Sequence, residues 1–554
     1  MDKIWLKSYP QGIPAEVPVP AHKSLGEFFL DCAQKYAELP CFENMGKVLT
    51  YADCERLSGQ VAAYLMNDLG MKKGDRIALM MPNCLQYPVM MYAAFRAGLT
   101  VVNVNPLYTT PEFVHQVNDA EASTVVVFAN MATTVQKGLS ECPALKHVII
   151  TELGDLFDTP KKQIVNFAAH YIVNPYHKAH IPHAISFNEM LKKGAQENFK
   201  DVPCAMEDIA FLQYTGGTTG VAKAAMLTHG NMLWNIDQGT AWIGQELVKG
   251  KELIVTALPL YHIFSLTANC LCFNKMGAKN LLITNPRDIK GFVKELSKHP
   301  FTVMTGVNTL FNALLNNSDF CKLDFSRLKI TMGGGMAVQH AVAKRWKDVT
   351  GVPLIEAYGL TETSPAAVIN PFTSKDYTGA IGLPISSTEA KIIDDDGNEL
   401  DLSQTGELCI RGPQVMKGYW KRPDETEKVL TPDGWLKTGD IGRMDAKGFI
   451  FLVDRKKDMI LVSGFNVYPN EIEDVVMQMP GVLECAAVGM PSGTSGQQVK
   501  LFVVKKDPNL TEKQIHDHCH ENLTGYKMPK VIVFKDSLPK TNVGKILRRE
   551  LRDA

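Results

Sequence analysis

Glycines, threonines and a lysine are concentrated in one short segment that follows an apolar run. Residues 213–223 read Gln-Tyr-Thr-Gly-Gly-Thr-Thr-Gly-Val-Ala-Lys. Glycines let backbone N–H groups approach phosphate oxygens, the threonine hydroxyls add donors, and the lysine adds a mobile positive charge. A Walker A loop would have its lysine directly after the last glycine, but Val221 and Ala222 intervene here, and Ala224 replaces the required serine or threonine. The segment therefore predicts a phosphate-binding loop outside the P-loop NTPase class.

Four other segments carry residue types that suit a nucleotide site. Residues 358–362 (Tyr-Gly-Leu-Thr-Glu) place a hydroxyl beside a carboxylate, and residues 433–440 end in an acid after a glycine. Residues 333–337 begin with three glycines after a strand-like run, and residues 539–545 end on a lysine near the C-terminus. Each segment alone is a weak signal, but the order of all five is specific.

Alternating strands and helices must position these segments. From about residue 50, helix-like apolar spacing alternates with strand-like runs at 76–81, 99–104, 123–128, 147–151, 209–214, 281–284, 302–305 and 329–332. This alternation predicts an α/β fold with largely parallel sheets. After Pro384, short β segments between turn signals indicate a smaller β subdomain. The charged run 453–458 is either a solvated turn or a hinge, since the residues beyond it suffice for a small α+β domain.

Composition narrows the function classes. The 554 residues carry a formal net charge of -1, which gives no overall field for nucleic acid or for an anionic membrane. The twelve cysteines form no Cys-x-x-Cys pair, which predicts a reducing compartment. The N-terminus lacks a continuous apolar stretch, so we expect no signal peptide and a cytoplasmic chain.

Two segments have a second interpretation. Residues 253–274 contain no charged residue and reach the length of a membrane span, but Pro259, His262 and Asn269 interrupt them. We expect a buried strand followed by a core helix. His516, His518, Cys519 and His520 resemble a metal cluster, but an exposed amphipathic helix over 511–523 is the favoured interpretation.

The five segments, in this order, resemble the adenylate-forming superfamily of acyl-CoA synthetases, luciferases and peptide-synthetase adenylation domains, and the similarity runs essentially from end to end. Residues 433–440 and the Asp-Arg-Lys-Lys-Asp run 454–458 resemble the bacterial long-chain fatty acyl-CoA synthetase pattern. Such enzymes join a carboxylate to the α-phosphate of ATP with release of pyrophosphate, and the thiol of coenzyme A then displaces AMP.

The resemblance implies a domain plan. Residues 1–453 would form a large N-terminal domain of two parallel-rich α/β subdomains and a small β subdomain. Residues 454–458 would be the hinge, with Lys457 as its pivot, and residues 459–554 a mobile α+β lid. Rotation of the lid would withdraw the catalytic lysine and bring up a surface for the thiol, formed by Ser463, Gly464, Phe465 and Tyr468.

The resemblance also implies an ATP site. The phosphate-loop positions are Tyr214, Thr215, Gly216, Gly217, Thr218, Thr219, Gly220, Val221, Ala222, Lys223, Ala224 and Ala225. The positions around adenine, where Tyr358 would stack, are Gly333, Gly334, Gly335, Met336, Glu356, Ala357, Tyr358 and Gly359, and Thr361 is a further position of the ATP site. Glu362, with Thr215 or Thr361, would place Mg²⁺, a cation that prefers oxygen ligands. Asp440 would accept from the ribose hydroxyls, and Arg455 would reach the ribose or a phosphate. Relatives carry Pro at Ala222 and Gly at Ala224, so the exit of the loop differs in shape.

Lys545 is the expected catalytic cation, bridging the acyl carboxylate and the α-phosphate. A solvated lysine in a basic tail is the alternative for an isolated lysine. His262 matches a position near the acyl carboxylate, although an ordinary core histidine explains it equally well. The acyl pocket is expected at Tyr261, His262, Gly306 and Val307, where core packing is again the alternative.

The expected function is activation of long-chain fatty acids with ATP, Mg²⁺ and coenzyme A. The resemblance also implies a homodimer and contact with the cytoplasmic face of the inner membrane, although no amphipathic anchor is evident in the sequence. Three alternatives stay open: a fatty acyl-AMP ligase that loads a carrier protein, a synthetase for an aryl acid, and a non-catalytic fatty-acid binding protein. Lys223, Glu362, Asp440 and Lys545 argue against the last of these.

Overall fold

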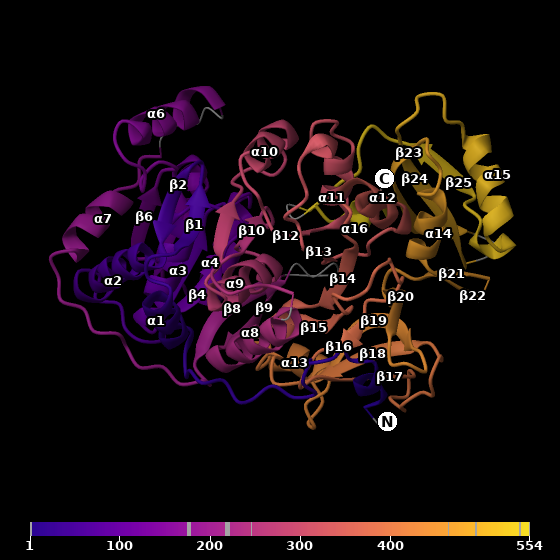
Figure 1. Ribbon diagram of the computed structural model, residues 1–554, viewed down its shortest axis with the longest axis horizontal. Coiled ribbons are helices and arrows are strands. Elements are labelled where there is room, and N and C mark those ends of the chain that lie inside the picture. Colours follow the sequence, from indigo (N-terminus) through magenta and orange to yellow (C-terminus); the bar gives the residue numbers. More distant parts are fainter. Residues whose placement is uncertain are drawn as a thin grey trace.

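A computed structural model of the chain describes residues 3–173, 179–215, 222–244, 246–463, 465–492, 496–541 and 544–552. Within these ranges the strands form four sheets. Two large sheets with flanking helices make up most of the molecule, and two smaller sheets follow them in the chain (Figure 1). The expected α/β fold with a small β subdomain and a C-terminal α+β unit is confirmed.

The first large sheet contains most of the strands expected in the N-terminal half. Its order is β7 (Ile185–Ser186), β6 (His147–Thr151), β5 (Thr124–Phe128), β3 (Arg76–Met80), β4 (Thr100–Asn103), β8 (Ile209–Thr215) and β9 (Lys223–Thr228). All neighbours are parallel except β8 and β9, which run antiparallel and flank the predicted phosphate loop.

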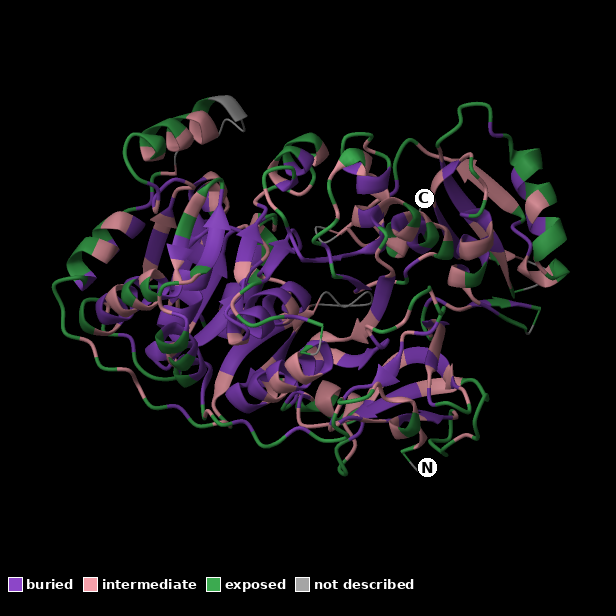
Figure 2. Cartoon of the chain, viewed as in Figure 1, coloured by how far each residue is buried: buried purple, intermediate pink, exposed green. Residues whose placement is uncertain are grey.

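Helices cover both faces of this sheet. Successive side chains of a strand point to opposite faces. Ile77 and Leu79 therefore pack with α1 (Leu25–Lys35), α2 (Tyr51–Asn67) and α3 (Gln86–Arg96), whereas Ala78 and Met80 pack with α4 (Thr110–Ala120) and α5 (Ala132–Gly138). Burial on both faces explains why strands such as β5, Thr-Val-Val-Val-Phe, are continuous apolar runs. The strands at the centre of the two large sheets are purple in Figure 2, and the green, exposed residues lie mainly on the outer helices and loops.

The second large sheet has the order β16 (Leu383–Pro384), β15 (Ala366–Ile369), β14 (Leu354–Gly359), β13 (Ile330–Gly334), β12 (Val303–Gly306), β10 (Leu253–Thr256), β11 (Lys279–Leu282), β1 (Pro40–Asn44) and β2 (Lys47–Thr50). One face packs on α10 (Ile289–Leu296), α11 (Asn308–Leu315) and α12 (His340–Thr350). The other face packs on α8 (His229–Ile243) and α9 (Cys272–Lys275).

The charge-free segment 253–274 forms β10 and then a π-helical turn, η5 (Ser265–Leu271), that runs into α9. Its side chains are mostly buried inside the protein, as the strand-and-helix interpretation predicted. Among the described residues, no helix combines the length and apolar content needed to cross a bilayer.

The β subdomain after Pro384 is a four-stranded antiparallel sheet of β17 (Glu389–Ile393), β18 (Gly406–Arg411), β19 (Leu436–Met444) and β20 (Ile450–Arg455), with α13 (Pro423–Val429) beside it. The N-terminal turn η1 (Ile4–Ser8) packs on this subdomain through the buried side chain of Trp5. The first residues of the chain therefore contact a subdomain that is formed by residues more than 380 positions later in the sequence.

The C-terminal unit contains a mixed sheet with the order β22 (Phe465–Val467), β21 (Ile460–Val462), β24 (Gly496–Lys505) and β23 (Val482–Ser492), and β25 (Val531–Phe534) pairs with β24. Helices α14 (Pro469–Val476) and α15 (Glu512–Asn522) pack on one face, and α16 (Arg548–Arg552) packs on the other. Cys519 of the histidine-rich segment is buried in this core, which supports the amphipathic-helix interpretation.

Candidate active site

A cleft of about 1620 Å³ lies where the carboxyl ends of strands from both large sheets meet the C-terminal unit. Ligands of open α/β sheets bind at this edge, where the strand order changes. The residues predicted from the sequence that line the cleft are Tyr214, Thr215, Ala222, Lys223, Tyr261, His262, Gly333, Gly334, Gly335, Glu356, Ala357, Tyr358, Gly359, Thr361, Glu362, Asp440, Arg455, Lys457 and Lys545.

Asp440 is held at one side of the cleft by an aromatic hydroxyl and a guanidinium. Its Oδ2 accepts a hydrogen bond of 2.6 Å from the Tyr358 hydroxyl, and its Oδ1 lies 3.4 Å from Nε of Arg455. Asp440 is only 4% exposed, and it is the cross-strand partner of Arg455 in the β19–β20 pair. The carboxylate is therefore fixed in an orientation that suits acceptance from a ligand hydroxyl.

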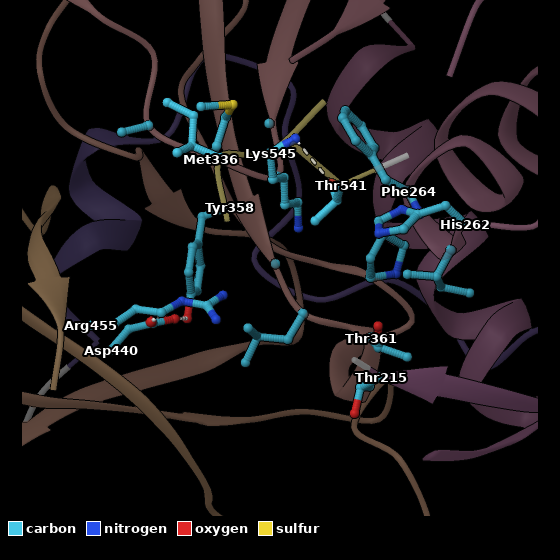
Figure 3. A pocket seen from close by; sticks show the side chains of 18 of the residues that line it. Thr215, His262, Phe264, Met336, Tyr358, Thr361, Asp440, Arg455, Thr541 and Lys545 are labelled. Atoms are coloured by element: carbon cyan, nitrogen blue, oxygen red, sulfur yellow. Dashed lines mark hydrogen bonds and ion pairs between the residues drawn. The ribbon is translucent and has the colours of Figure 1, made fainter. Parts of the chain in front are cut away.

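Lys545 points into the cleft from the C-terminal unit. Figure 3 shows its side chain between the Asp440–Arg455 pair and His262, directed toward Thr361 and Thr215. Burial, reinforced by Arg455, lowers the pKa of Lys545 to about 8, while the Asp440 and Glu362 carboxylates act in the opposite direction. The lysine is therefore buried beside the side chains of Arg455, Asp440 and Glu362 rather than in a solvated tail.

The segment that carries Lys545 is anchored to the large unit. Thr309 donates a hydrogen bond of 2.9 Å to the carbonyl of Gly544, and the Lys545 N–H donates to Oγ1 of Thr541. Gly335, at φ +78°, lies opposite: a Cβ there would be 3.4 Å from Cε of the lysine. A side chain at that left-handed position would be strained and would crowd the lysine.

Glu362 and Lys223 are joined through Tyr419, which the sequence did not single out. The Tyr419 hydroxyl donates to Glu362 Oε1 at 2.7 Å, and the Lys223 ammonium lies 4.4 Å from the centroid of the same ring. The ammonium also pairs with Oε2 of Glu425, in the first turn of α13, at 2.6 Å. Glu362 keeps a second carboxylate oxygen, and the Thr215 hydroxyl is a further oxygen donor lining the cleft. These hard oxygen donors suit Mg²⁺.

His262 is a neutral imidazole in this cleft. Burial, with a contribution from the Lys545 charge, lowers the pKa of His262 to about 3. The Phe264 N–H donates to Nδ1 at 3.3 Å, so the ring proton is assigned to Nε2. His262 can therefore donate, but does not carry charge, at neutral pH.

Glu356 offers an unusual acceptor at the end of β14. Its side chain is buried, and Oε2 has no hydrogen-bond partner within the described part of the chain. Burial raises the pKa of Glu356 well above its ordinary value, and Asp474 of the C-terminal unit adds like charge. Burial and Glu473 raise the pKa of Asp474 itself to about 7. Glu356 of the second large sheet and Asp474 of the C-terminal unit thus lie near each other, and both have a raised pKa.

Two family models match most of the chain. The AMP-binding enzyme model matches residues 29–420, and the AMP-binding enzyme C-terminal domain model matches residues 471–545. The chain belongs to the AMP-binding enzyme family.

Individual relatives agree with this membership. The long-chain-fatty-acid–CoA ligase of Escherichia coli O157:H7 is 58% identical, with 100% of this chain and 98% of that protein covered. The enzyme of the same name from Haemophilus influenzae is 50% identical over 100% and 98% of the two chains. The solved structure of ATP-bound MatB from Rhodopseudomonas palustris superposes with a TM-score of 0.81 at 26% identity, covering 95% of this chain and 98% of that one.

The cleft of this AMP-binding enzyme extends into an apolar region, of which the sequence indicated the side that follows Tyr261 but not the side formed by α8. Besides Tyr261 and Phe264, its walls include Asn235, Gly239 and Ile243 of α8 and Thr267, Ala268 and Cys272 of the η5–α9 helix. At Gly239, a Cβ would lie 3.1 Å from Sγ of Cys272, so the missing side chain keeps the two helices close. The signal in the sequence was the charge-free window 253–274, which by itself indicates only burial.

Residues 216–221 of the phosphate loop and Gly464 lie outside the described residues. Of the expected site residues that the structure describes, several are not at the cleft surface. Ala224 and Ala225 are buried in the β8–β9 ladder, because β9 begins at Lys223 and turns its small side chains into the core. Gly306 and Val307 are not among the described lining residues; a Cβ at Gly306 would meet the Phe311 ring, and Val307 packs with Leu258 and Met332.

The described residues of the expected coenzyme A surface lie outside the lining of the cleft. These residues are Ser463, Phe465 and Tyr468, and none of them is among the described residues that line the cleft. Phe465 is 55% exposed and stacks on Tyr526, with the ring centroids 4.7 Å apart. The sequence could not indicate this arrangement of the C-terminal unit, in which Lys545 is inside the cleft and Phe465 is outside it.

Proposed function

We propose that this AMP-binding enzyme activates long-chain fatty acids to acyl-CoA through an acyl-adenylate, with release of AMP and pyrophosphate. The position of Lys545, inside a cleft that also contains Asp440 and Glu362, carries the proposal. The full-length similarity to long-chain-fatty-acid–CoA ligases supports the substrate class. The acyl-AMP ligase, aryl-acid and non-catalytic alternatives have no comparable support.

The nucleotide would lie along β13 and β14. The glycines 333–335 leave room for the adenine beside Tyr358, and Asp440 would accept from the ribose hydroxyls while Arg455 holds its other oxygen. Glu356 would accept from a donor in the same region. In this arrangement Tyr358 has two roles, since its ring faces the base and its hydroxyl orients Asp440.

The phosphates would lie near Lys223 and the loop before it. Thr215 and Glu362 would hold Mg²⁺, with Thr361 nearby, and the cation when bound would neutralise phosphate charge and orient the leaving pyrophosphate. Lys223 would exchange Glu425 for a phosphate oxygen. Catalysis would then consist mainly of bringing two anions together and neutralising them.

Two groups would act on the acyl carboxylate. The charged Lys545 would bridge the carboxylate and the α-phosphate, which lowers their repulsion as the new bond forms. Neutral His262 would donate from Nε2 to a carboxylate oxygen without adding charge. The hydrocarbon chain would continue past Tyr261 into the apolar region between α8 and the η5–α9 helix.

The second half-reaction requires another lid position. We place the N-terminal domain at 1–453, the hinge at 454–458 and the lid at 459–554, with Lys457 as the pivot. Rotation would withdraw Lys545 and present Ser463, Gly464, Phe465 and Tyr468 to coenzyme A. We further place the enzyme in the cytoplasm, at the cytoplasmic face of the inner membrane, as a homodimer.

The test is release of pyrophosphate from ATP, Mg²⁺ and palmitate, with and without coenzyme A, followed by mass analysis of the products. We expect palmitoyl-CoA only when coenzyme A is present. Palmitoyl-AMP as the final product despite coenzyme A would indicate an acyl-AMP ligase, and turnover of coumarate instead of palmitate an aryl-acid synthetase. Palmitate binding without ATP consumption in the wild type, unchanged in Lys545→Ala, would indicate a binding protein.

A further inference from the structure

Helix α11 lies beside the C-terminal unit and donates two hydrogen bonds to it (Figure 1). The Thr309 hydroxyl donates to the carbonyl of Gly544 at 2.9 Å, and Nδ2 of Asn312 donates to the carbonyl of Leu483 at 3.0 Å. Leu483 lies in β23, whereas Gly544 directly precedes Lys545. Between residues that the structure describes, no other hydrogen bond joins the large unit to the C-terminal unit away from the hinge. One short helix thus contacts two separate segments of the C-terminal unit.

The other face of α11 is fixed to the large unit. Phe311 and Leu314 are fully buried in the core beneath the second large sheet, and the Phe311 ring packs against Trp346 with the centroids 4.7 Å apart. Residues three positions apart lie on the same side of a helix, so Thr309 and Asn312 form one polar face. The apolar face therefore holds the helix in place while the polar face contacts the C-terminal unit.

The contact at Gly544 restrains the backbone that carries Lys545. Gly544 has φ +85°, and a Cβ there would lie 2.8 Å from Oγ1 of Thr309, so a side chain would be strained and would separate the two segments. The carbonyl that accepts from Thr309 belongs to the peptide group that also contains the Lys545 nitrogen. Because a peptide group is planar, holding its oxygen restricts its nitrogen as well. Thr309 therefore restrains Lys545 through the backbone.

Both hydrogen bonds depend on the orientation of the C-terminal unit. Their donors belong to the large unit and their acceptors to the C-terminal unit, so a rotation that withdraws Lys545 from the cleft would break both. A neutral hydrogen bond contributes only modestly to stability, because each partner can bond to water instead. A contact that exists in one state only shifts the population toward that state. Two such bonds therefore favour one orientation and still permit its reversal.

We propose that Thr309 and Asn312, which we call the α11 latch, are positioning residues that hold the C-terminal unit in the orientation for adenylation and release it for the thiol step. The inference rests on the proposed function, because it assumes that Lys545 serves the first half-reaction and leaves before the second. Loss of the latch should therefore slow formation of the acyl-adenylate and leave the attack by coenzyme A unimpaired. A residue with a general role in stability would affect both steps.

The experiment measures the two half-reactions of the full-length enzyme separately. The first is pyrophosphate release from ATP, Mg²⁺ and palmitate in a single turnover without coenzyme A, and the second is palmitoyl-CoA formation from added palmitoyl-AMP and coenzyme A. The double variant Thr309→Val, Asn312→Ala should slow the first about tenfold, as expected for the loss of two hydrogen bonds, and leave the second unchanged or faster. Thr309→Ser keeps the hydroxyl and should resemble wild type in both.

The matched control is Asn118→Ala. Asn118 of α4 donates from Nδ2 to the carbonyl of Glu141 at 2.8 Å, so this substitution removes the same kind of hydrogen bond within the large unit. Both half-reactions should keep the wild-type rate. Thermal unfolding checks that each variant folds, and if the double variant does not, the comparison of Thr309→Val with Thr309→Ser replaces it.

Acetylation of Lys545 measures the orientation of the C-terminal unit without turnover. Lys545 is buried in the cleft, so a water-soluble amine reagent reaches it only when the unit turns away. In the ligand-free enzyme, Lys545 should react about three- to tenfold faster in the double variant than in wild type. Lys513, whose side chain on α15 is 87% exposed, is the internal reference and should react equally in both. Peptide mass spectrometry quantifies both lysines.

Four results would overturn the proposal: equal slowing of the two half-reactions, an unchanged first half-reaction, unchanged acetylation of Lys545, or the same loss in Asn118→Ala. The proposed function fails separately. Wild type that forms no palmitoyl-AMP would remove that function, and faster acetylation of Lys545 in the double variant would still support the latch. Palmitoyl-CoA formation by wild type, with no change in the double variant, would remove the latch alone.

Discussion

The ammonium of Lys223 lies 2.6 Å from the carboxylate of Glu425, so the cation expected to hold phosphate already has an anionic partner within the protein. Glu425 also accepts from Lys428 at 2.6 Å, and these two lysines lower its pKa to about 2. The carboxylate is therefore ionised at neutral pH and would compete with a phosphate for Lys223 in the proposed site.

Replacement of Glu425 by glutamine should tighten ATP binding. The glutamine keeps the shape of the side chain but removes the competing charge, and we expect a decrease in the dissociation constant of up to about fivefold, as for a partly exposed ion pair. Calorimetric titration with ATP measures it. Glu427→Gln, on the exposed side of the same helix, is the matched control, and unchanged or weaker binding by Glu425→Gln would reject the competition.

Tyr419→Phe should impair the metal requirement selectively. Phenylalanine keeps the ring under Lys223 and removes only the hydroxyl that holds Glu362 Oε1. Since hydrogen bonds to charged groups are strong, we expect the Mg²⁺ concentration for half-maximal pyrophosphate release to rise about three- to tenfold.

The direct measurement for Tyr419→Phe is the affinity for Mn²⁺ in the presence of ATP, with electron paramagnetic resonance as the readout of bound Mn²⁺. Tyr9→Phe removes a hydroxyl that donates to Pro384, away from the cleft, and serves as the control. If the metal dependence of Tyr419→Phe equals that of wild type, Tyr419 does not position Glu362.

The first half-reaction should decline in alkaline solution. In the proposed mechanism Lys545 acts in its charged form, which is present below its pKa of about 8 and lost above it. We expect kcat/KM for pyrophosphate release without coenzyme A to fall above about pH 8. Because a bound anion favours the charged form, the corresponding limb of kcat should lie at higher pH.

The control for this profile is Lys545→Arg, which stays charged throughout the range. Its activity should be low but should lack the limb near pH 8. A wild-type kcat/KM that is flat from pH 7 to about 9.5 would contradict the assignment.

Lys457→Pro should separate the half-reactions. Lys457 lies in the turn between β20 and β21, where Arg552 donates to its carbonyl and pairs with Asp458 at 2.7 Å. Proline fixes one backbone dihedral, so it should obstruct rotation but permit the arrangement in which Lys545 is in the cleft. We expect retained pyrophosphate release and lost palmitoyl-CoA. Lys457→Ala should retain both, and equal loss of both steps in the proline variant would exclude the hinge.

Local sequence patterns predicted much of the fold. The run 147–151 coincides with β6, and most other expected strands differ from the structure by one or two residues at an end. Periodicity could not show that β1 and β2 join the second sheet, because the neighbour of β1 is β11, more than two hundred residues away. Such pairing depends on tertiary packing, which a local window does not contain.

The site was predictable only where a motif marks it. Asp440, Glu362 and Lys545 stand in recognisable segments, and all three line the cleft. Tyr419 and Glu425 act through contacts with residues 57 and 202 positions away, so nothing near them in the sequence gives them a role. Thr309 and Asn312 likewise contact carbonyls 235 and 171 positions away, in a unit whose orientation only the fold shows.

Asp440 and Arg455 are paired across β19 and β20, and the chain leaves β20 at Arg455. A pivot at Lys457 would thus begin two residues from Arg455, which pairs with the carboxylate proposed to hold the ribose. The axis of lid rotation would pass beside the nucleotide instead of at a distance from it. AMP would then stay bound to the N-terminal domain through both half-reactions. The rotating lid would remove Lys545 from the acyl carbonyl carbon and let the thiol of coenzyme A approach the same atom.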